Sequence, residues 1–232
     1  MKNNFNNDNT YHKTLKYGSI AFLVLLLIES VAYFGFLKFV PNFLSKYLIW
    51  IIYLNISVVT LSMSVLYILF NKEKVPCMTG MMIGMTIGMQ IGMMIGAVIG
   101  ATNGYFTGAM VGMILGSIGG TIAGFTSKST MAWVQGLMSG IMGGTMGPMI
   151  SVMMFTDRIQ IFMPFYMLLN VMLLWGFLKM YHEEVIKDNN DLVRKNVDLI
   201  TFVSATIIIT TLLIIIMIYG PKSPIFASTG IV

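Results

Sequence analysis

The chain has 232 residues, of which 56% are hydrophobic and only 10% are charged, and its mean hydropathy is +0.82. Soluble domains carry about 25% charged residues, so this composition excludes an ordinary water-soluble protein and predicts an all-α, polytopic membrane protein with a single membrane domain. We interpret the net charge of +5 as loop charge that faces the cytoplasm and anionic lipid, and we expect no nucleic-acid partner.

Seven apolar runs, bounded by charged residues, Pro or Asn, are long enough to cross a bilayer, which takes about 20 residues. The polar residues 1–17 form a tail, and residues 18–70 hold two conventional spans rich in Leu, Ile, Val and Phe. Residues 77–155 hold three spans rich in Gly and Met, and residues 161–219 hold two further conventional spans separated by the charged loop 183–198. The expected spans are 18–40, 48–70, 77–101, 104–126, 131–155, 161–181 and 199–219.

The Lys and Arg residues divide unevenly between the two sides that these spans define. Ten lie on the side of the N-terminus and four lie on the opposite side. Because cytoplasmic loops carry the excess of Lys and Arg, we expect a multi-pass protein of the cell membrane. Its N-terminus would lie in the cytoplasm and its C-terminus outside.

Polar side chains are rare inside the predicted spans. Glu29 lies within the first span, where a charged group is costly and often serves as a contact for a proton or a cation. The alternative is a protonated carboxyl group that is hydrogen-bonded to a neighbouring side chain. We expect Asn55, Gln90, Gln135 and Asn170 to form hydrogen bonds between helices.

Glycine recurs at every fourth position in the middle of the chain, and 18 of the 23 Gly residues lie between Gly80 and Gly147. Residues four apart share one ridge of a helix, and a ridge of Gly allows another helix backbone to approach closely in lipid. We therefore predict a glycine-zipper bundle with crossing angles near −40°. Its partners are either the neighbouring spans or a second copy in a homo-oligomer. The predicted packing residues are Gly80, Gly84, Gly88, Gly92, Gly96, Gly100, Gly108, Gly112, Gly116, Gly120, Gly136, Gly140 and Gly144.

The residues Asn103 and Gly104 separate the third predicted span from the fourth. Asn and Gly are favoured in turns because both tolerate backbone conformations that other residues avoid. We therefore expect a tight turn at this point, which would place the two spans side by side and antiparallel.

Methionine is concentrated on the same central helices, where 16 of the 23 Met residues lie between Met78 and Met154. On a helical wheel the Met of the fifth span cover about 80° of arc opposite its Gly, and those of the third span cover about 120° beside Cys77. Met is a flexible filler of irregular gaps, but stacked thioethers that begin at a Cys are also soft ligands suited to Cu(I). The candidate metal ligands are Cys77, Met78, Met81, Met82, Met85, Met89, Met93, Met138, Met142, Met146, Met149 and Met153.

The combination of MxxxM and GxxxG inside membrane helices resembles the eukaryotic high-affinity copper transporters. Met81, Met85, Met89 and Met93, within the Gly80–Gly100 register, match these two motifs. The resemblance implies Met pairs that select copper and a glycine motif that packs an oligomer. The chain departs from that family in its number of expected spans, because the family has three.

Signatures of catalysis are missing from the sequence. His12 and His182 lie in the polar tail and at a helix end, so neither is placed to form a Ser-His pair within the membrane. We expect the chain not to be an enzyme. The leading hypothesis is a membrane protein whose Met-lined helix faces bind or transport Cu(I). The alternative is a structural glycine-zipper scaffold or an oligomeric pore that has no metal role.

Overall fold

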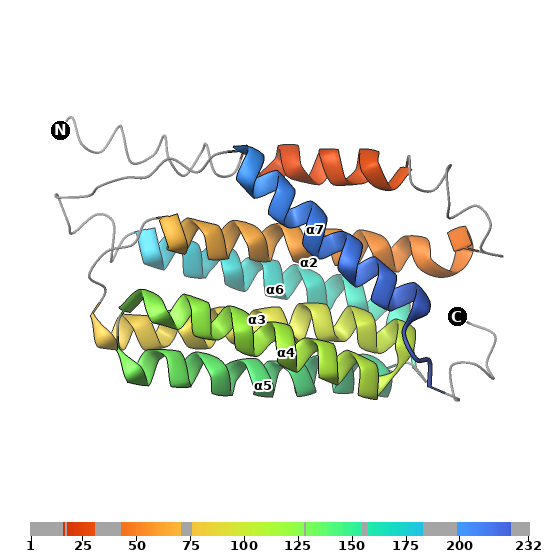
Figure 1. Ribbon diagram of the computed structural model, residues 1–232. Coiled ribbons are helices and arrows are strands. Elements are labelled where there is room, and N and C mark those ends of the chain that lie inside the picture. Colours follow the sequence, from red (N-terminus) through yellow and green to blue (C-terminus); the bar gives the residue numbers. More distant parts are fainter. Residues whose placement is uncertain are drawn as a thin grey trace.

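The computed structural model describes residues 16, 18–30, 43–70, 76–127, 129–154, 157–182 and 199–223. Every regular element in these ranges is helical, which confirms the all-α class (Figure 1). The predicted polar tail, apart from Lys16, and the charged loop 183–198 lie outside the described residues. The elements are a short apolar helix Gly18–Ser30, α2 (Phe43–Phe70), α3 (Cys77–Asn103), α4 (Tyr105–Gly124), the 3-10 helix η2 (Phe125–Ser127), α5 (Thr130–Met153), α6 (Ile159–Tyr181) and α7 (Leu199–Tyr219).

Five of these helices are long and apolar enough to cross a membrane. The helix α5 has 24 residues, but its many Gly residues and its Ser and Thr residues make it less apolar, and it is not one of the five. The helix Gly18–Ser30 is apolar but shorter, and residues 31–40 of the first predicted span lie outside the described residues. The five candidate spans are Tyr47–Leu69, Cys77–Asn103, Tyr105–Ser127, Ile159–Tyr181 and Ile200–Tyr219.

The three Gly- and Met-rich helices, α3, α4 and α5, pack against one another more extensively than any other elements do. We call them the central unit. The helices α2 and α6 lie along one side of this unit, and α7 crosses α2 obliquely, from the level of the helix Gly18–Ser30 to the level of the turn between α3 and α4 (Figure 1). Buried apolar side chains gather where α2, α6 and α7 meet α3, among them Leu54, Tyr67, Ile83, Ile87, Ile91, Met94, Met163, Tyr181 and Leu213.

The connection between α3 and α4 is the predicted tight turn at Asn103 and Gly104. Gly104 has a φ of 108°, in the region that favours glycine. The segment after α7 is hydrogen-bonded to the residues on both sides of this turn. The backbone N–H of Ser223 donates to the Asn103 carbonyl, and the Thr107 hydroxyl donates to the Pro221 carbonyl. The turn therefore makes α3 and α4 antiparallel and holds the end of α7 beside them.

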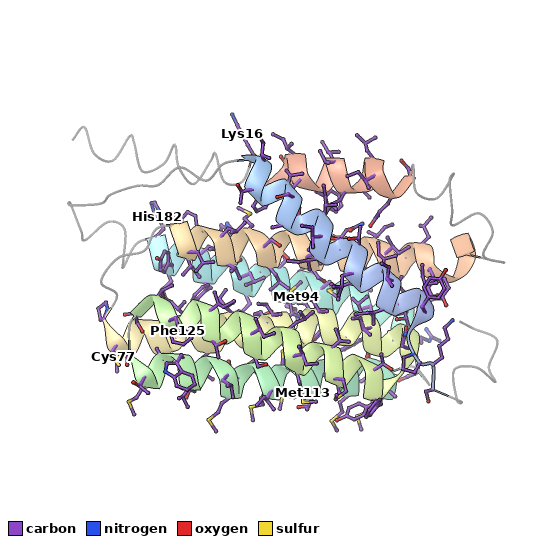
Figure 2. The ribbon with its side chains drawn as sticks, viewed as in Figure 1. Lys16, Cys77, Met94, Met113, Phe125 and His182 are labelled. Atoms are coloured by element: carbon purple, nitrogen blue, oxygen red, sulfur yellow. The ribbon has the colours of Figure 1, made fainter. Side chains whose placement is uncertain are left out.

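The order of contacts along the helices gives their directions. Gly84 and Gly92 of α3 lie against Gly136 and Gly144 of α5, in ascending order along both helices, so α3 and α5 are parallel. Figure 2 places Lys16, Cys77 and His182 at the same end of the helices. This is the end that the distribution of Lys and Arg predicts to be cytoplasmic.

Cys77 allows a direct test of that orientation because it is the single cysteine of the chain and is exposed. We expect a membrane-impermeant maleimide to label Cys77 in inside-out vesicles and to leave it unlabelled in intact cells, measured by a mass shift of the protein. The matched control is the double variant Cys77→Ser, Ser223→Cys, whose thiol lies at the other end and should show the opposite pattern. Labelling of Cys77 from outside intact cells would reverse the orientation.

Candidate functional site

The axis of the central unit is built from glycine backbone. A Cβ atom added at Gly88 would lie 2.6 Å from the Gly136 carbonyl oxygen and 3.1 Å from Gly120 Cα. One added at Gly116 would lie 2.8 Å from the Gly140 carbonyl oxygen and 3.0 Å from that of Gly88. The three helices are therefore in backbone contact, and all thirteen predicted packing glycines are buried.

These backbone contacts continue along the full length of α3. Near one end a Cβ at Gly84 would lie 2.8 Å from the Ala132 carbonyl oxygen, and at the other end a Cβ at Gly100 would lie 2.8 Å from Pro148 Cα. Helices that cross near −40° touch only around one point, because their axes diverge on both sides of it. The predicted crossing is therefore wrong for this unit, whose helices lie nearly parallel or antiparallel.

The glycine ridges are occupied by neighbouring helices of the same chain. This decides between the two partners that the sequence allowed, because a second copy would have to displace α4 or α5 to reach the ridge of α3. A homo-oligomer remains a prediction, but its contacts would have to use another surface.

The Met side chains of α5 point away from the glycine axis. Their exposed fractions range from 39% at Met146 to 68% at Met131. On α3, Met78, Met82 and Met85 are exposed, whereas Met81, Met89 and Met93 are half-buried. Figure 2 shows sulfur atoms along the outer edge of the central unit, where Met113 of α4 is labelled.

The Met faces of α3 and α5 border the same line of contact. A Cβ at Gly143 would lie 2.9 Å from Met89 Cα, and one at Gly147 would lie 2.9 Å from Met93 Cα, so this part of α3 rests directly on α5. Gln135 of α5 donates to the sulfur of Met85, with 3.6 Å between Nε2 and Sδ. We call this surface the methionine seam, formed by Met78, Met81, Met82, Met85, Met89 and Met93 of α3 and by Met131, Met138, Met142, Met146, Met149 and Met153 of α5.

Cys77 lies at one end of the methionine seam. Its Sγ atom is 3.0 Å from the Oγ atom of Ser129, which precedes the first residue of α5. Met78 and Met131 are the first Met residues of their helices and are both exposed. Among the described residues, no group of three His, Cys, Asp or Glu side chains is placed to hold a metal ion. A metal at the seam would therefore bind to thioethers and to this one thiol.

Several Met residues outside the seam are buried instead, although Met110 of α4 and Met172 of α6 are exposed. Met94, Met163 and Met217 are fully buried, and the Met167 sulfur accepts a hydrogen bond from Ser57 at 3.6 Å. These side chains fill space between helices, as expected of a flexible apolar residue. The filler interpretation therefore fits these buried residues, whereas the seam Met of α5 fill no gap within the chain.

The predicted polar contacts have mixed outcomes. Asn55 donates to Glu29 between two helices, and Gln135 donates to Met85, so both of these predictions are confirmed. Asn170 donates to a carbonyl one turn earlier in its own helix, so the prediction of an interhelical bond is wrong there. Buried Gln90 has an Oε1 atom without a hydrogen-bond partner among the described residues.

Five long apolar helices, a shorter apolar helix and many large apolar side chains on the outer surface define a helical, multi-span membrane protein in contact with a lipid bilayer. Comparison of the chain with protein-family models, with curated proteins and with solved structures gave no match. The assignment to this class therefore depends on the composition and packing of the helices themselves.

Substitution of a packing glycine tests the central unit. We expect Gly88→Ala to lower the free energy of unfolding by about 1–3 kcal/mol, the usual cost of overpacking, because the added methyl group would meet the backbone of α5. The matched control is Gly176→Ala in α6, where no atom lies within 4 Å of the added Cβ. This change should leave stability unchanged or slightly raised. Unfolding of both variants in detergent micelles provides the measurement, and equal effects would contradict the backbone contact.

Proposed function

We propose that the chain is a seven-span protein of the cell membrane, with a cytoplasmic N-terminus, that binds Cu(I) at the methionine seam. The observation that carries this proposal is that the Met faces of α3 and α5 border one line of contact, with an exposed thiol at its end. Thioether and thiolate sulfur are soft ligands and favour Cu(I) over the hard cations Mg²⁺ and Ca²⁺.

The exposure of the seam supports a ligand role for its Met residues. A filler residue stabilises a protein by occupying a gap, but the seam Met of α5 are exposed on the chain. Contact with lipid does not require Met, because the conventional helices expose Leu and Ile, as at Leu168, Ile208 and Ile215. Single exposed Met residues also occur on α4 and α6, at Met110 and Met172, but rows of several exposed Met are found on α3 and α5. These rows are better explained by the sulfur atom than by the shape of the side chain.

The location of the seam also limits how a cation would move. Glycine backbone fills the axis of the central unit, so that axis offers no space for an ion. Along α3, by contrast, Met81, Met85, Met89 and Met93 follow one another at intervals of about 6 Å of helix rise. Transport would accordingly proceed along the outer surface by exchange between neighbouring sulfur atoms.

The competing proposal is a structural membrane protein without a metal role. The observation that favours it is the glycine packing of α3, α4 and α5, which joins the helices without any ligand. In that case the methionine seam would be a flexible apolar contact surface. Both proposals require the same fold, and they differ only in whether the sulfur atoms are needed.

Replacement of Met by Leu separates the two proposals. We expect the variant Met85→Leu, Met89→Leu, Met142→Leu, Met146→Leu to lose bound copper down to background. Leu lacks the sulfur ligand, whereas a volume-conserving change costs less than about 1.5 kcal/mol of stability at each site. The measurement is the metal content of the purified protein after growth with copper.

The control for this experiment replaces four Met residues that lie away from the seam. The variant Met94→Leu, Met163→Leu, Met167→Leu, Met217→Leu changes the same number of sulfur atoms, all at buried positions. This variant should keep its metal content. Elution as a single species in size-exclusion chromatography would establish that it folds. Equal metal content in the folded seam variant and the native protein would reject the copper proposal.

A further inference from the structure

The helix Gly18–Ser30 packs on α2 through one face that ends in a carboxyl group. Ala21 and Leu25 on this face are 0% and 2% exposed. Glu29 follows Leu25 at the same four-residue spacing and so belongs to the same face. Its partner Asn55 on α2 is fully buried and lies eight residues, or about 12 Å of helix rise, inside the apolar span that begins at Tyr47.

The hydrogen bonds between these two side chains are incomplete. Asn55 Nδ2 donates to Glu29 Oε2 at 2.6 Å. The other oxygen of each group, Glu29 Oε1 and Asn55 Oδ1, is buried and has no partner among the described residues. An ionised carboxylate only accepts hydrogen bonds, so in that state two buried acceptor oxygens, one on each side chain, are left without a donor. This is costly in an apolar interior.

Among the described residues, no cation on the helices around α2 is seen to pair with this excess of acceptors, and Lys222, which follows α7, donates to the Tyr47 hydroxyl near the start of α2 instead. In the described ranges of α3, α4 and α7 there is no Asp, Glu, Lys, Arg or His, and the ionisable side chains there are Cys77, Tyr105 and Tyr219. The remaining charged residues on the packed helices lie near their ends, Lys46 in α2 and Lys179 in α6. The tyrosines of α2 and α6 are Tyr47, Tyr53, Tyr67, Tyr166 and Tyr181, and His182 follows α6.

We propose that Glu29 and Asn55 form a proton-binding site within the membrane. A single proton on Glu29 Oε1 supplies the missing donor and, with a small rotation of the amide, joins the two unpartnered oxygens. The pair is then a ring of two hydrogen bonds without net charge. Two free oxygens are too few for a hard metal cation, which takes about six or more oxygen ligands. Glu29 is half-buried, so the proton can exchange.

The site is separate from the methionine seam. The helix Gly18–Ser30 lies on the far side of α2 from α5 (Figure 1). Loss of the proton would leave a charge and unpaired oxygens at the contact between the two helices and would weaken it. Occupancy of this site would therefore control how firmly the first helix is held on α2, whatever the seam binds.

Reaction with dicyclohexylcarbodiimide tests the proposal on the native full-length chain. This reagent adds to a protonated carboxyl group in apolar surroundings and forms an N-acylurea with no leaving group, which mass spectrometry of peptides locates. We expect modification of Glu29 at neutral pH and none of Asp157, an exposed carboxylate at the start of α6. Glu29→Gln should abolish the label and keep the helix contact, because an amide provides both a donor and an acceptor.

Infrared difference spectroscopy between the native protein and Glu29→Gln provides a second measurement if the reagent does not reach the site. A carbonyl band of a protonated acid that is lost in the variant would support the proposal even without labelling. A carboxylate band in its place would overturn it. Protection of Glu29 from the reagent by sodium chloride, compared with choline chloride, would also overturn it, because the ligand would then be a metal cation.

Discussion

Contact between glycine backbones is the constraint on which the rest of this structure depends. Lipid supplies no hydrophobic force that joins helices, so close packing has to do so. Gly costs about 1 kcal/mol in a helix exposed to water, but a helix in lipid cannot expose its backbone without losing hydrogen bonds. A sequence with this many glycines can therefore remain helical in a membrane and gain close contact along three helices at once.

This contact also determines where the larger side chains lie. With the glycine ridges turned to a common axis, the other residues of α3, α4 and α5 must face the remaining helices or the outside. On α3 the two directions differ in chemistry, because Ile83, Ile87 and Ile91 are buried within the fold while Met78, Met82 and Met85 are exposed. The division is incomplete, because Met94 of the same helix is buried together with these Ile side chains.

Much of the helical architecture could be predicted from the sequence. The ends of α3 and α7 and the turn at Gly104 follow from local signals, namely apolar length, charge and residues that favour turns. The crossing angle and the partner of Asn170 were predicted wrongly. Both depend on how two helices meet, whereas spacing along one helix defines only which residues share a face.

The sequence by itself determined that the chain is helical, that it belongs in a membrane, and that its glycines and methionines are concentrated on defined faces of the same helices. These properties depend on composition and on the period of the α-helix, which are local. Only the tertiary structure decided that the glycine ridges close on one another within the chain, that the Met faces of α3 and α5 border one seam, and that Glu29 meets Asn55. Each of these is a contact between segments distant in the sequence. Such a contact depends on how the surfaces of several helices fit together, which the spacing of residues along one helix does not define.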